Sequence, residues 1–431
     1  MAEVRGATAM SQLLDEVLAS RQEELFIGFT FPSLDGEWVA LVDDCRLAVD
    51  DEVQRDVTGL HWTGDLTSQL YEEARRSGRG VIFLHAHAGS HEPPRLSPTD
   101  ERTAQEILPH LGMLLPDALH AYVVVNRAYV AGWVQHGDRT IEVDRIRIAT
   151  SPLRIWTSGP ESATNQVVLG RDQRQATALG GQGIRRLRAS TVAIVGVGGA
   201  GSQVAEMLAH AGVGRLVLVD ADLVEEVNLS RTHGTSPASI GSKKVDVAMS
   251  MIRHISPETE VSTVAEAFPS EDSLQALREA DAVVACVDGV HPRNELNRFA
   301  LRYAIPLIDL GTTITPAPFR VDGHLSLVMP GSHCLRCAGH VSDALLAEIS
   351  EVNRRGEYGL GEGRPQVVSF NGLLASAAVT EVLQLICGFA FREQGSCEWH
   401  YDPVAGELRR IDLPSGRCRE CVWYGMKGDR E

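Results

Sequence analysis

The groups in this sequence best able to do chemistry are a glycine-rich loop and the polar residues that follow it. The loop lies between an apolar run, residues 192–195, and a segment with helical spacing, residues 202–211. Backbone N–H groups in such a loop and at the start of the following helix can bind phosphate. An acidic residue about 20 positions further on can accept hydrogen bonds from ribose hydroxyls. The sequence therefore predicts a nucleotide site made of Gly196, Gly198, Gly199, Gly201, Asp220 and Asp222.

A second group of polar residues distinguishes between the nucleotide binders that share this pattern. Asn228, Arg231 and Lys244 come next, and the apolar run 283–287 ends at Asp288. A nicotinamide oxidoreductase does not need these polar groups at the phosphates, whereas cleavage of a triphosphate requires cations near the leaving pyrophosphate. A carboxylate suits Mg²⁺, which takes one or two carboxylates together with substrate phosphates. The pattern favours ATP and Mg²⁺ over a nicotinamide cofactor.

In this order the motifs resemble the ubiquitin-activating superfamily, including the adenylyltransferases that activate sulfur-carrier proteins for thiamine and molybdopterin synthesis. The similarity runs from about residue 170 to residue 425. It implies an α/β fold with a Rossmann-like, mostly parallel sheet, a homodimer, and a small ubiquitin-like partner with a Gly-Gly-type C-terminus. It also implies that Arg174 reaches the γ-phosphate of ATP in the partner subunit, and that Lys244 and Asp288 act in catalysis.

Cysteines form two CxxC pairs near the end of the chain, which we call the knuckles. Four thiolates in two such pairs suit one tetrahedral Zn²⁺ with no open position, so we expect a structural zinc site. Its ligands are Cys334, Cys337, Cys418 and Cys421. The remaining cysteines are Cys45, Cys286, Cys387 and Cys397. This usage does not suit a disulfide framework and favours the cytoplasm.

The main departure from the superfamily is that the chain lacks a cysteine where relatives have an acceptor thiol. Ubiquitin-activating relatives pass the adenylated C-terminus to a cysteine, and sulfur-carrier relatives often have one shortly after the first knuckle. Residues 338–386 contain no cysteine. Either the acyl-adenylate passes directly to an external nucleophile, with a conjugating or carrier protein as receiver, or a hydroxyl such as Ser342 or Ser369 replaces the thiol. We favour direct transfer.

A different set of metal-binding side chains occurs before residue 150. An apolar strand leads into His85 and His87, and Ser97 and Asp100 open a helical segment, residues 101–111. Two histidines at i and i+2 on a strand point to the same face. An aspartate at a helix start can complete a Zn²⁺ site whose fourth position stays open for water. The pattern predicts a catalytic zinc site.

This second pattern resembles the JAMM metallopeptidases of the MPN fold, which remove ubiquitin-like tags and share an upstream glutamate, HxHP, a short loop and SxxD. The resemblance implies that Ser97 helps to hold the tetrahedral intermediate and that a glutamate before the first strand is the general base. Glu23 and Glu24 both stand there, and we favour Glu24. The chain departs from the family at Ala88, where the family has proline, and in a longer loop that contains His91.

Composition limits the partner classes. The chain has 40 Lys plus Arg against 57 Asp plus Glu, a net charge of −17, which argues against a nucleic-acid surface. The apolar stretch 370–391 is interrupted by Glu381 and Gln384, so we expect a buried helix rather than a membrane span. An amphipathic run containing Asp15 and Glu16 is not typical of a signal peptide.

The sequence thus predicts a JAMM-like α+β domain over residues 1–150, a linker over 151–165 and an adenylation domain over 166–431. The expected function is ATP-dependent adenylation of a ubiquitin-like protein, coupled to its zinc-dependent processing or removal. Two alternatives stay open. One is activation of a sulfur carrier for thiamine or molybdopterin synthesis, and the other is a front domain without metal that only docks the partner.

Overall fold

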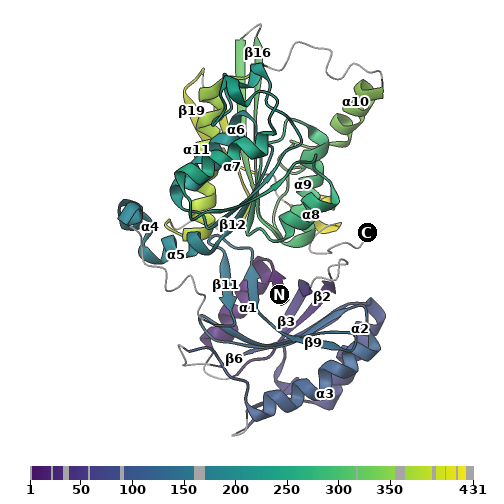
Figure 1. Ribbon diagram of the computed structural model, residues 1–431. Coiled ribbons are helices and arrows are strands. Elements are labelled where there is room, and N and C mark those ends of the chain that lie inside the picture. Colours follow the sequence, from purple (N-terminus) through teal and green to yellow (C-terminus); the bar gives the residue numbers. More distant parts are fainter. Residues whose placement is uncertain are drawn as a thin grey trace. The chain divides into compact units, whose positions relative to one another are not determined.

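The computed structural model describes residues 2–20, 23–32, 38–56, 59–87, 92–159, 170–316, 319–354, 365–390, 395–402, 404–413 and 416–423. The chain divides into two compact units. The first unit consists mainly of Met1–Asn165, and the second mainly of Gln166–Leu301 and Ile305–Trp423. Figure 1 draws the first in purple to blue and the second in teal to yellow.

A nine-stranded mixed sheet, in the order β11-β10-β1-β3-β2-β6-β7-β8-β9, is the centre of the first unit. Its strands are β1 (Ala2–Gly6), β2 (Phe26–Pro32), β3 (Trp38–Leu47), β6 (Gly80–Ala86), β7 (Leu119–Val125), β8 (Val130–His136), β9 (Arg139–Glu142), β10 (Arg145–Ile148) and β11 (Arg154–Thr157). A separate hairpin joins β4 (Val53–Asp56) to β5 (Gly59–Trp62), and the helices are α1 (Thr8–Ala19), α2 (Gly64–Ser77) and α3 (Pro98–Leu114).

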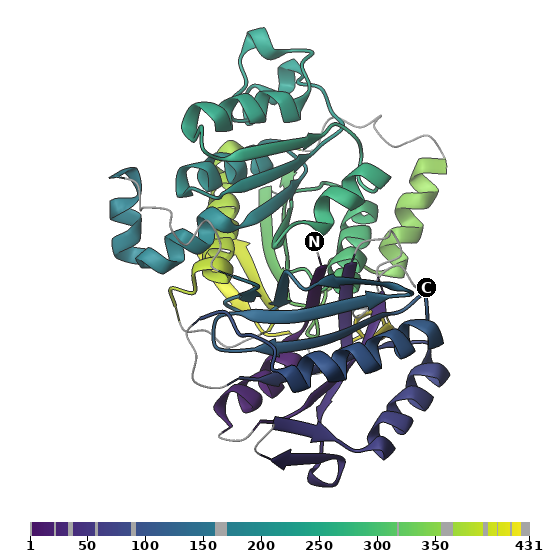
Figure 2. The same ribbon diagram turned by 60° about the horizontal axis from the view of Figure 1, so that its bottom comes forward.

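Both faces of this sheet are buried. Along β6, Ile82 and Leu84 pack into one apolar core with residues of α1, whereas Val81 and Phe83 pack into a second core with residues of α2 and α3. Figure 2 shows α2 and α3 along the sheet. Burial on two faces explains why β6 is a continuous apolar run, since alternate residues of a strand point to opposite faces. The same packing fixes the position of His85, near the end of β6.

Part of the expected linker is a strand instead. β11 pairs antiparallel with β10 at the edge of the sheet. Trp156 is buried, and its indole N–H donates to the carbonyl of Asn126 at 3.0 Å. Four residues are too few to show an alternating pattern, so this strand could not be predicted from the sequence. Residues 160–165 lie outside the described part of the chain.

An eight-stranded sheet, in the order β14-β13-β12-β15-β16-β17-β18-β19, is the centre of the second unit. Its strands are β12 (Thr191–Val195), β13 (Arg215–Val219), β14 (Glu260–Val264), β15 (Ala282–Ala285), β16 (Leu307–Pro316), β17 (Phe319–Val328), β18 (Cys397–Asp402) and β19 (Glu407–Ile411). The helices are α4 (Gln173–Leu179), α5 (Gly181–Ala189), α6 (Gly199–Ala211), α7 (Lys244–Ile255), α8 (Glu271–Arg278), α9 (Val290–Tyr303), α10 (Asp343–Arg354), α11 (Val368–Cys387) and α12 (Arg419–Trp423).

The predicted α/β class is confirmed, but the sheet is mixed. The neighbouring strands β14, β13, β12, β15 and β16 pair in parallel. The strands from β16 through β17 and β18 to β19 pair antiparallel. The central strand β12 lies between β13 and β15, so the loops after β12 and β15 leave the sheet on either side of a switch point. Crevices at such points bind ligands in open α/β sheets. The topology therefore places the glycine loop and Asp288 at one crevice.

Helix α11 is the one described helix that is long and apolar enough to span a membrane by length and composition. Most of its apolar stretch is buried inside the second unit, including Glu381 and Gln384. The Gln384 amide bonds both backbone groups of Ala390, at 2.6 and 2.9 Å. The expected buried helix is therefore confirmed, although it ends at Cys387 and Phe391 lies outside the described residues.

Candidate functional site

Close backbone packing explains the glycines of the loop between β12 and α6. A Cβ on Gly201 would lie 1.8 Å from the carbonyl oxygen of Gly196, a distance that no side chain tolerates. Gly196 itself has a φ of 87°, in the left-handed region that favours glycine. The loop therefore presents bare backbone at the start of α6, where the free N–H groups of a helix favour an anion.

Asp220 ties this loop to the end of β13. Its Oδ2 accepts the N–H of Val197 at 2.6 Å, and its Oδ1 accepts the N–H of Asp222 at 2.8 Å. Burial raises the pKa of Asp220. The carboxylate thus stands beside the loop where the sequence placed it, and holds the backbone there. Asp222 pairs in turn with Lys244, whose Nζ lies 2.7 Å from its Oδ2.

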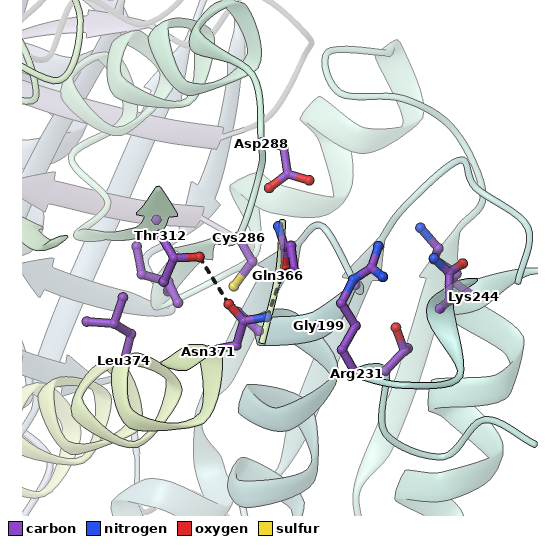
Figure 3. A pocket seen from close by; sticks show the side chains of 15 residues that line it. Gly199, Arg231, Lys244, Cys286, Asp288, Thr312, Gln366, Asn371 and Leu374 are labelled. Carbon is purple, nitrogen blue, oxygen red and sulfur yellow. Dashed lines mark hydrogen bonds between the residues drawn. The ribbon is translucent and has the colours of Figure 1, made fainter. Parts of the chain in front are cut away.

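A pocket opens beside the loop, and Figure 3 shows the side chains that line it. It brings together the predicted residues Gly198, Gly199, Asn228, Arg231, Lys244 and Asp288. Gly196, Gly201, Asp220 and Asp222 are not among its lining residues. The two glycines lie within the loop, and Asp220 is bonded to it. Residues from β12, β15 and the segment before α7 therefore meet at one site, as the strand order requires.

Gly199 lies between two different side chains of the pocket. A Cβ there would come within 2.5 Å of Asn371 Nδ2 and 3.3 Å of Arg231 Cδ. Arg231 is braced by a bond from its Nη1 to the carbonyl of Val227 at 2.7 Å. In Figure 3, Arg231 and Lys244 stand on one side of Gly199 and the Asn371 amide on the other. The pocket therefore has a cationic end and a neutral polar end.

The neutral end was missed by sequence reasoning. Thr312 donates its hydroxyl to Asn371 Oδ1 at 3.1 Å, and Asn371 Nδ2 donates to Gln366 Oε1 at 3.0 Å. These residues are more than 100 positions from the loop, and no local pattern marks them. Thr232 also lines the pocket, with a buried hydroxyl that has no hydrogen-bond partner in the described part of the chain. Its position next to Arg231 was the only available signal.

The segment that carries Asp288 is held in place by Arg293. Arg293 donates from Nη2 to the carbonyl of Val287 at 3.0 Å and from Nε to Asp309 Oδ1 at 2.9 Å. Nε2 of His324 lies 2.9 Å from the other oxygen of Asp309. Burial alone would raise the pKa of Asp309, but the charge of Arg293 and the contact with His324 lower it. The ionised carboxylate fixes Arg293, and Arg293 fixes the backbone just before Asp288.

The thiol of Cys286 also faces the pocket. Burial and the carboxylates of Asp309 and Asp288 raise its pKa well above the ordinary range. Burial raises the pKa of Cys45 and of Cys387 to about 11 each. Thiols with such pKa values stay protonated at neutral pH, and a protonated thiol is a poor nucleophile. None of these three cysteines is suited to accept an acyl group.

Arg174 does not reach the pocket of its own chain. It lies on α4, its side chain is exposed, and it is absent from the residues that line the pocket. The neighbouring Arg171 is held by the carbonyl of Ile255 at 3.0 Å. A role for Arg174 in a partner subunit therefore remains a prediction.

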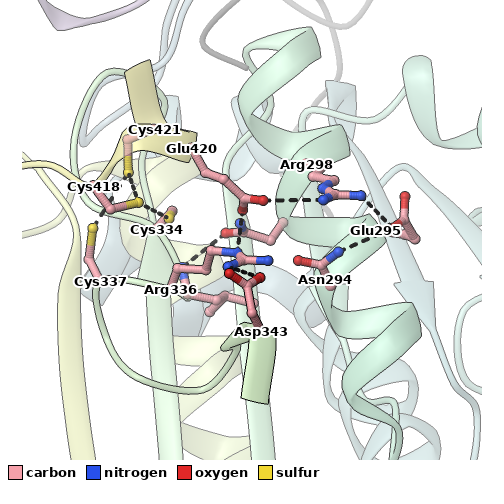
Figure 4. Close-up of polar contacts among 12 residues, drawn as sticks. Asn294, Glu295, Arg298, Cys334, Arg336, Cys337, Asp343, Cys418, Glu420 and Cys421 are labelled. Carbon is pink, nitrogen blue, oxygen red and sulfur yellow. Dashed lines mark hydrogen bonds and ion pairs between the residues drawn. The ribbon is translucent and has the colours of Figure 1, made fainter. Parts of the chain in front are cut away.

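The four predicted cysteines of the knuckles come together (Figure 4). Sγ of Cys334 lies 3.6 Å from that of Cys418, and Sγ of Cys337 lies 3.5 Å from that of Cys421. Zn–S bonds of about 2.3 Å at tetrahedral angles set the sulfurs about 3.8 Å apart. The thiols therefore fit a zinc ion that they enclose completely.

An ion-pair network joins the knuckles independently of a metal (Figure 4). Nε of Arg336, in the first knuckle, lies 2.6 Å from Oε2 of Glu420, in the second. The other oxygen of Glu420 lies 3.2 Å from Arg298 on α9, and Arg336 Nη1 lies 2.8 Å from Asp343. The side chains of Arg336 and Glu420 are each 16% exposed, so the pair is shielded from water. The network connects the cysteine cluster to α9.

The first unit brings together His85, His87 and Asp100. Nε2 of His85 and Nε2 of His87 are 3.2 Å apart, and they lie 3.2 and 3.4 Å from the oxygens of Asp100. Zn–N and Zn–O bonds of about 2.0–2.1 Å at tetrahedral angles set neighbouring ligand atoms about 3.3 Å apart. The three groups therefore fit a zinc ion with a fourth position open. Ala88 and His91 lie outside the described residues.

Ser97 and Asp100 form the N-terminal cap of α3. The N–H of Asp100 donates to Ser97 Oγ at 3.1 Å, and the N–H of Ser97 donates to Asp100 Oδ2 at 2.7 Å. This reciprocal cap places the carboxylate at the triad. The Ser97 oxygen is used as an acceptor, which leaves its proton available for donation. Tyr122, which sequence reasoning missed, donates its hydroxyl to Asp100 Oδ1 at 2.9 Å.

The two glutamates before β2 have different surroundings. Oε2 of Glu24 is paired with Arg55 at 2.7 Å. The pKa of His87 is raised mainly by its hydrogen bond with Asp100, against the effect of burial, and the charges of Asp100 and Glu23 raise it further. Neighbouring residues of an extended chain point to opposite sides, so these surroundings favour Glu23, and the choice of base stays a prediction.

A sequence model of the ThiF family matches residues 172–422, more than half of the chain. Over 273 residues the chain is 30% identical to ubiquitin-like modifier-activating enzyme 5 of Gallus gallus, covering 59% of this chain and 65% of that protein. It is 31% identical to adenylyltransferase and sulfurtransferase MOCS3 of Sus scrofa, covering 61% and 55%. It is 28% identical to the molybdopterin-synthase adenylyltransferase of Escherichia coli, covering 54% and 86%.

The chain therefore spans less than two thirds of the length of the first two relatives. Among solved structures it is similar to E. coli MccB in complex with MccA-N7isoASN, with a TM-score of 0.50 and 22% identity over 61% of this chain and 76% of that one. This likeness shows a common fold. With the family match over the whole pocket and both knuckles, the chain belongs to the ThiF family.

Proposed function

We propose that the second unit adenylates the C-terminal carboxylate of a small ubiquitin-like protein, with ATP as the donor. One observation carries this proposal: a single pocket is lined by the glycine loop, by the cations Arg231 and Lys244, and by the carboxylate of Asp288. Relatives named as a ubiquitin-like modifier-activating enzyme and as adenylyltransferases support the same reaction.

In this reaction the protein has to position ATP and the partner carboxylate and to neutralise the charge of the phosphates. A carboxylate oxygen of the partner attacks the α-phosphorus of ATP, the bond from that phosphorus to the bridging oxygen breaks, and pyrophosphate leaves. Loop N–H groups at the start of α6 hold the phosphates, while Arg231 and Lys244 offset the charge that develops on pyrophosphate. Lys244 gives up its pairing with Asp222 as phosphate replaces that carboxylate. The acyl group enters from the neutral end, beside Asn371 and Thr312.

Mg²⁺ fits this pocket through Asp288. A single carboxylate beside the phosphate site meets the preference of Mg²⁺ for one or two carboxylates and several phosphate or water oxygens. Bound there, the ion supplies further neutralisation of the phosphate charge. Arg293 keeps Asp288 in place by holding the carbonyl of Val287.

Arg174 completes the site from a second copy of the chain in this proposal. An Arg174→Ala chain mixed with an Asp288→Ala chain should regain activity, because one pocket of each heterodimer combines an intact Asp288 with an intact Arg174. Random pairing makes half of the dimers heterodimers, so about a quarter of wild-type activity should return. Partner-dependent exchange of labelled pyrophosphate into ATP measures it.

Each variant assayed alone should stay inactive, and Arg186→Ala, an exposed arginine on α5, should behave like wild type. If verified heterodimers regain nothing, Arg174 acts within its own chain or has no role. That result would leave the adenylation proposal itself intact.

We further propose that the first unit is a zinc peptidase that acts on the same small protein. His85, His87 and Asp100 would hold the ion, which supplies Lewis acidity and lowers the pKa of a bound water when present. Glu23 would take a proton from that water, and Ser97 would donate a hydrogen bond to the oxyanion. The substrate is either a C-terminal extension of the partner or an isopeptide bond to a target.

His87→Ala should reduce hydrolysis of an extended partner to background and leave ATP chemistry unchanged, because the two sites lie in different units. His110→Ala, an exposed histidine on α3, is the matched control. Mass spectrometry of the partner before and after incubation measures cleavage. Full cleavage by the His87→Ala chain would exclude the zinc peptidase and favour a front unit that only docks the partner.

Activation of a sulfur carrier is the second candidate, supported by the relatives of that type. Its first step is the same acyl-adenylate. The fate of that intermediate separates the two functions. Conversion to a thiocarboxylate in the presence of a sulfur donor indicates sulfur transfer, and capture by an amine indicates conjugation.

A further inference from the structure

Tyr122 lies directly behind the triad of the first unit. It stands on β7, and its hydroxyl donates to Asp100 Oδ1 at 2.9 Å. The same oxygen lies 3.2 Å from Nε2 of His85. Tyr122 is 2% exposed and Asp100 5%, so water does not compete for this bond. A buried phenol is thus hydrogen-bonded to the carboxylate of Asp100, which could also bind a metal ion.

The other oxygen of Asp100 is held from a different element. Oδ2 accepts the N–H of Ser97 at 2.7 Å and lies 3.4 Å from Nε2 of His87. The two oxygens of Asp100 therefore accept hydrogen bonds from different elements, one from Tyr122 on β7 and one from the N-terminal cap of α3. Two bonds on two oxygens fix the plane of the carboxylate as well as its position. Loss of either bond would allow the group to rotate.

Packing fixes the phenol in turn. The Tyr122 ring meets the His85 ring edge-on at 5.9 Å between centroids, and it lies 5.9 Å from the Trp62 ring. Trp62 is stacked on Phe83 at 5.1 Å. Because the ring has no freedom to follow a turning carboxylate, its hydroxyl acts as a fixed donor.

We propose that Tyr122 is a positioning residue that keeps Asp100 in the orientation required to bind a divalent metal ion with His85 and His87. The inference rests on the zinc site proposed above. Without the phenol, the carboxylate must be ordered when the metal binds, at a cost in affinity. Removal of groups that hold metal ligands typically lowers metal affinity about 10–100-fold.

Tyr122→Phe tests this proposal because it removes one oxygen and keeps the ring. Tyr71→Phe is the matched control, since Tyr71 packs against the same apolar core. ZnCl₂ is titrated by calorimetry into the full chain whose four-cysteine site is already loaded. Wild type and Tyr71→Phe should bind one further zinc equally, and Tyr122→Phe should bind it about 10–100-fold more weakly.

Unfolding temperatures with and without the further zinc separate positioning from folding. The metal-free Tyr122→Phe chain should unfold close to wild type, and zinc should raise its unfolding temperature less. Wild-type zinc affinity in Tyr122→Phe would overturn the role of Tyr122 and leave the zinc site standing. Absence of a further zinc in wild type, with no change in His87→Ala, would overturn the proposed site itself.

Discussion

Replacing Cys334 with serine should destabilise the second unit severely and abolish adenylation. A closed site of four thiolates contributes its metal-binding free energy to folding, on the order of 10 kcal/mol in isolated zinc-binding peptides. That figure is comparable to the whole stability of an ordinary domain. A chelator strong enough to remove the ion should have the same effect. Calorimetric unfolding and metal content measure both changes.

Cys397→Ser is the control, because Cys397 lies outside the cluster of four cysteines. The Arg336–Glu420 pair should keep part of the contact between the knuckles after zinc loss, but a single ion pair stabilises a fold far less than a bound structural metal ion does. It should not rescue the fold. A Cys334→Ser chain with full zinc content and wild-type unfolding temperature would contradict a structural zinc at the knuckles.

Asp288→Ala should reduce partner-dependent exchange of pyrophosphate into ATP by about 10²-fold or more. The carboxylate is the group in the pocket best suited to Mg²⁺, so its loss leaves the phosphate charge less neutralised in the transition state. Asp288→Asn should be almost as inactive, since a neutral amide replaces the charge without changing the size. Asp272→Ala, an exposed aspartate on α8, should exchange at the wild-type rate.

The unfolding temperature of Asp288→Ala should remain near wild type, because Arg293 holds the backbone of this segment at Val287. Wild-type exchange in Asp288→Ala would remove this residue from the chemistry. A large fall in stability would instead assign it a structural role.

The parts of the site that follow one another along the chain could be predicted from the sequence. The glycine loop, Arg231, Lys244 and Asp288 each sit next to a strand end, and a parallel sheet brings neighbouring strand ends to one edge. Asn371 and Thr312 could not be predicted, because they reach the loop from α11 and β16 through tertiary packing alone. Thr232 stands beside a predicted residue, yet only its burial beside the phosphate site distinguishes its hydroxyl.

The metal triad shows the same division. His85, His87 and Asp100 follow from strand alternation and from helix capping, both of which are local. The choice between Glu23 and Glu24 depends on how the chain enters β2, where Glu24 pairs with Arg55 on β4, a contact that no local pattern predicts. The expectation of a mostly parallel sheet was right for β12 to β16. It did not hold for β17 to β19, because β17 follows β16 and β19 follows β18 as antiparallel neighbours, and such pairs need no crossover helix between them.

Formation of an acyl-adenylate is tested most directly by intact-mass spectrometry of the small partner after incubation with the chain, ATP and Mg²⁺. The partner to use is a small ubiquitin-like protein with a Gly-Gly-type C-terminus. We expect partner that carries AMP on its C-terminus and no chain–partner adduct that reductant removes. The raised pKa values of Cys45, Cys286 and Cys387 disfavour their thiolates, and a zinc ion at the knuckles would occupy those four thiols. Cys397 is the remaining cysteine to which such an adduct would be mapped. Partner of unchanged mass while wild-type chain binds ATP, or a thiol-sensitive adduct on the chain, would contradict direct adenylation as the end point.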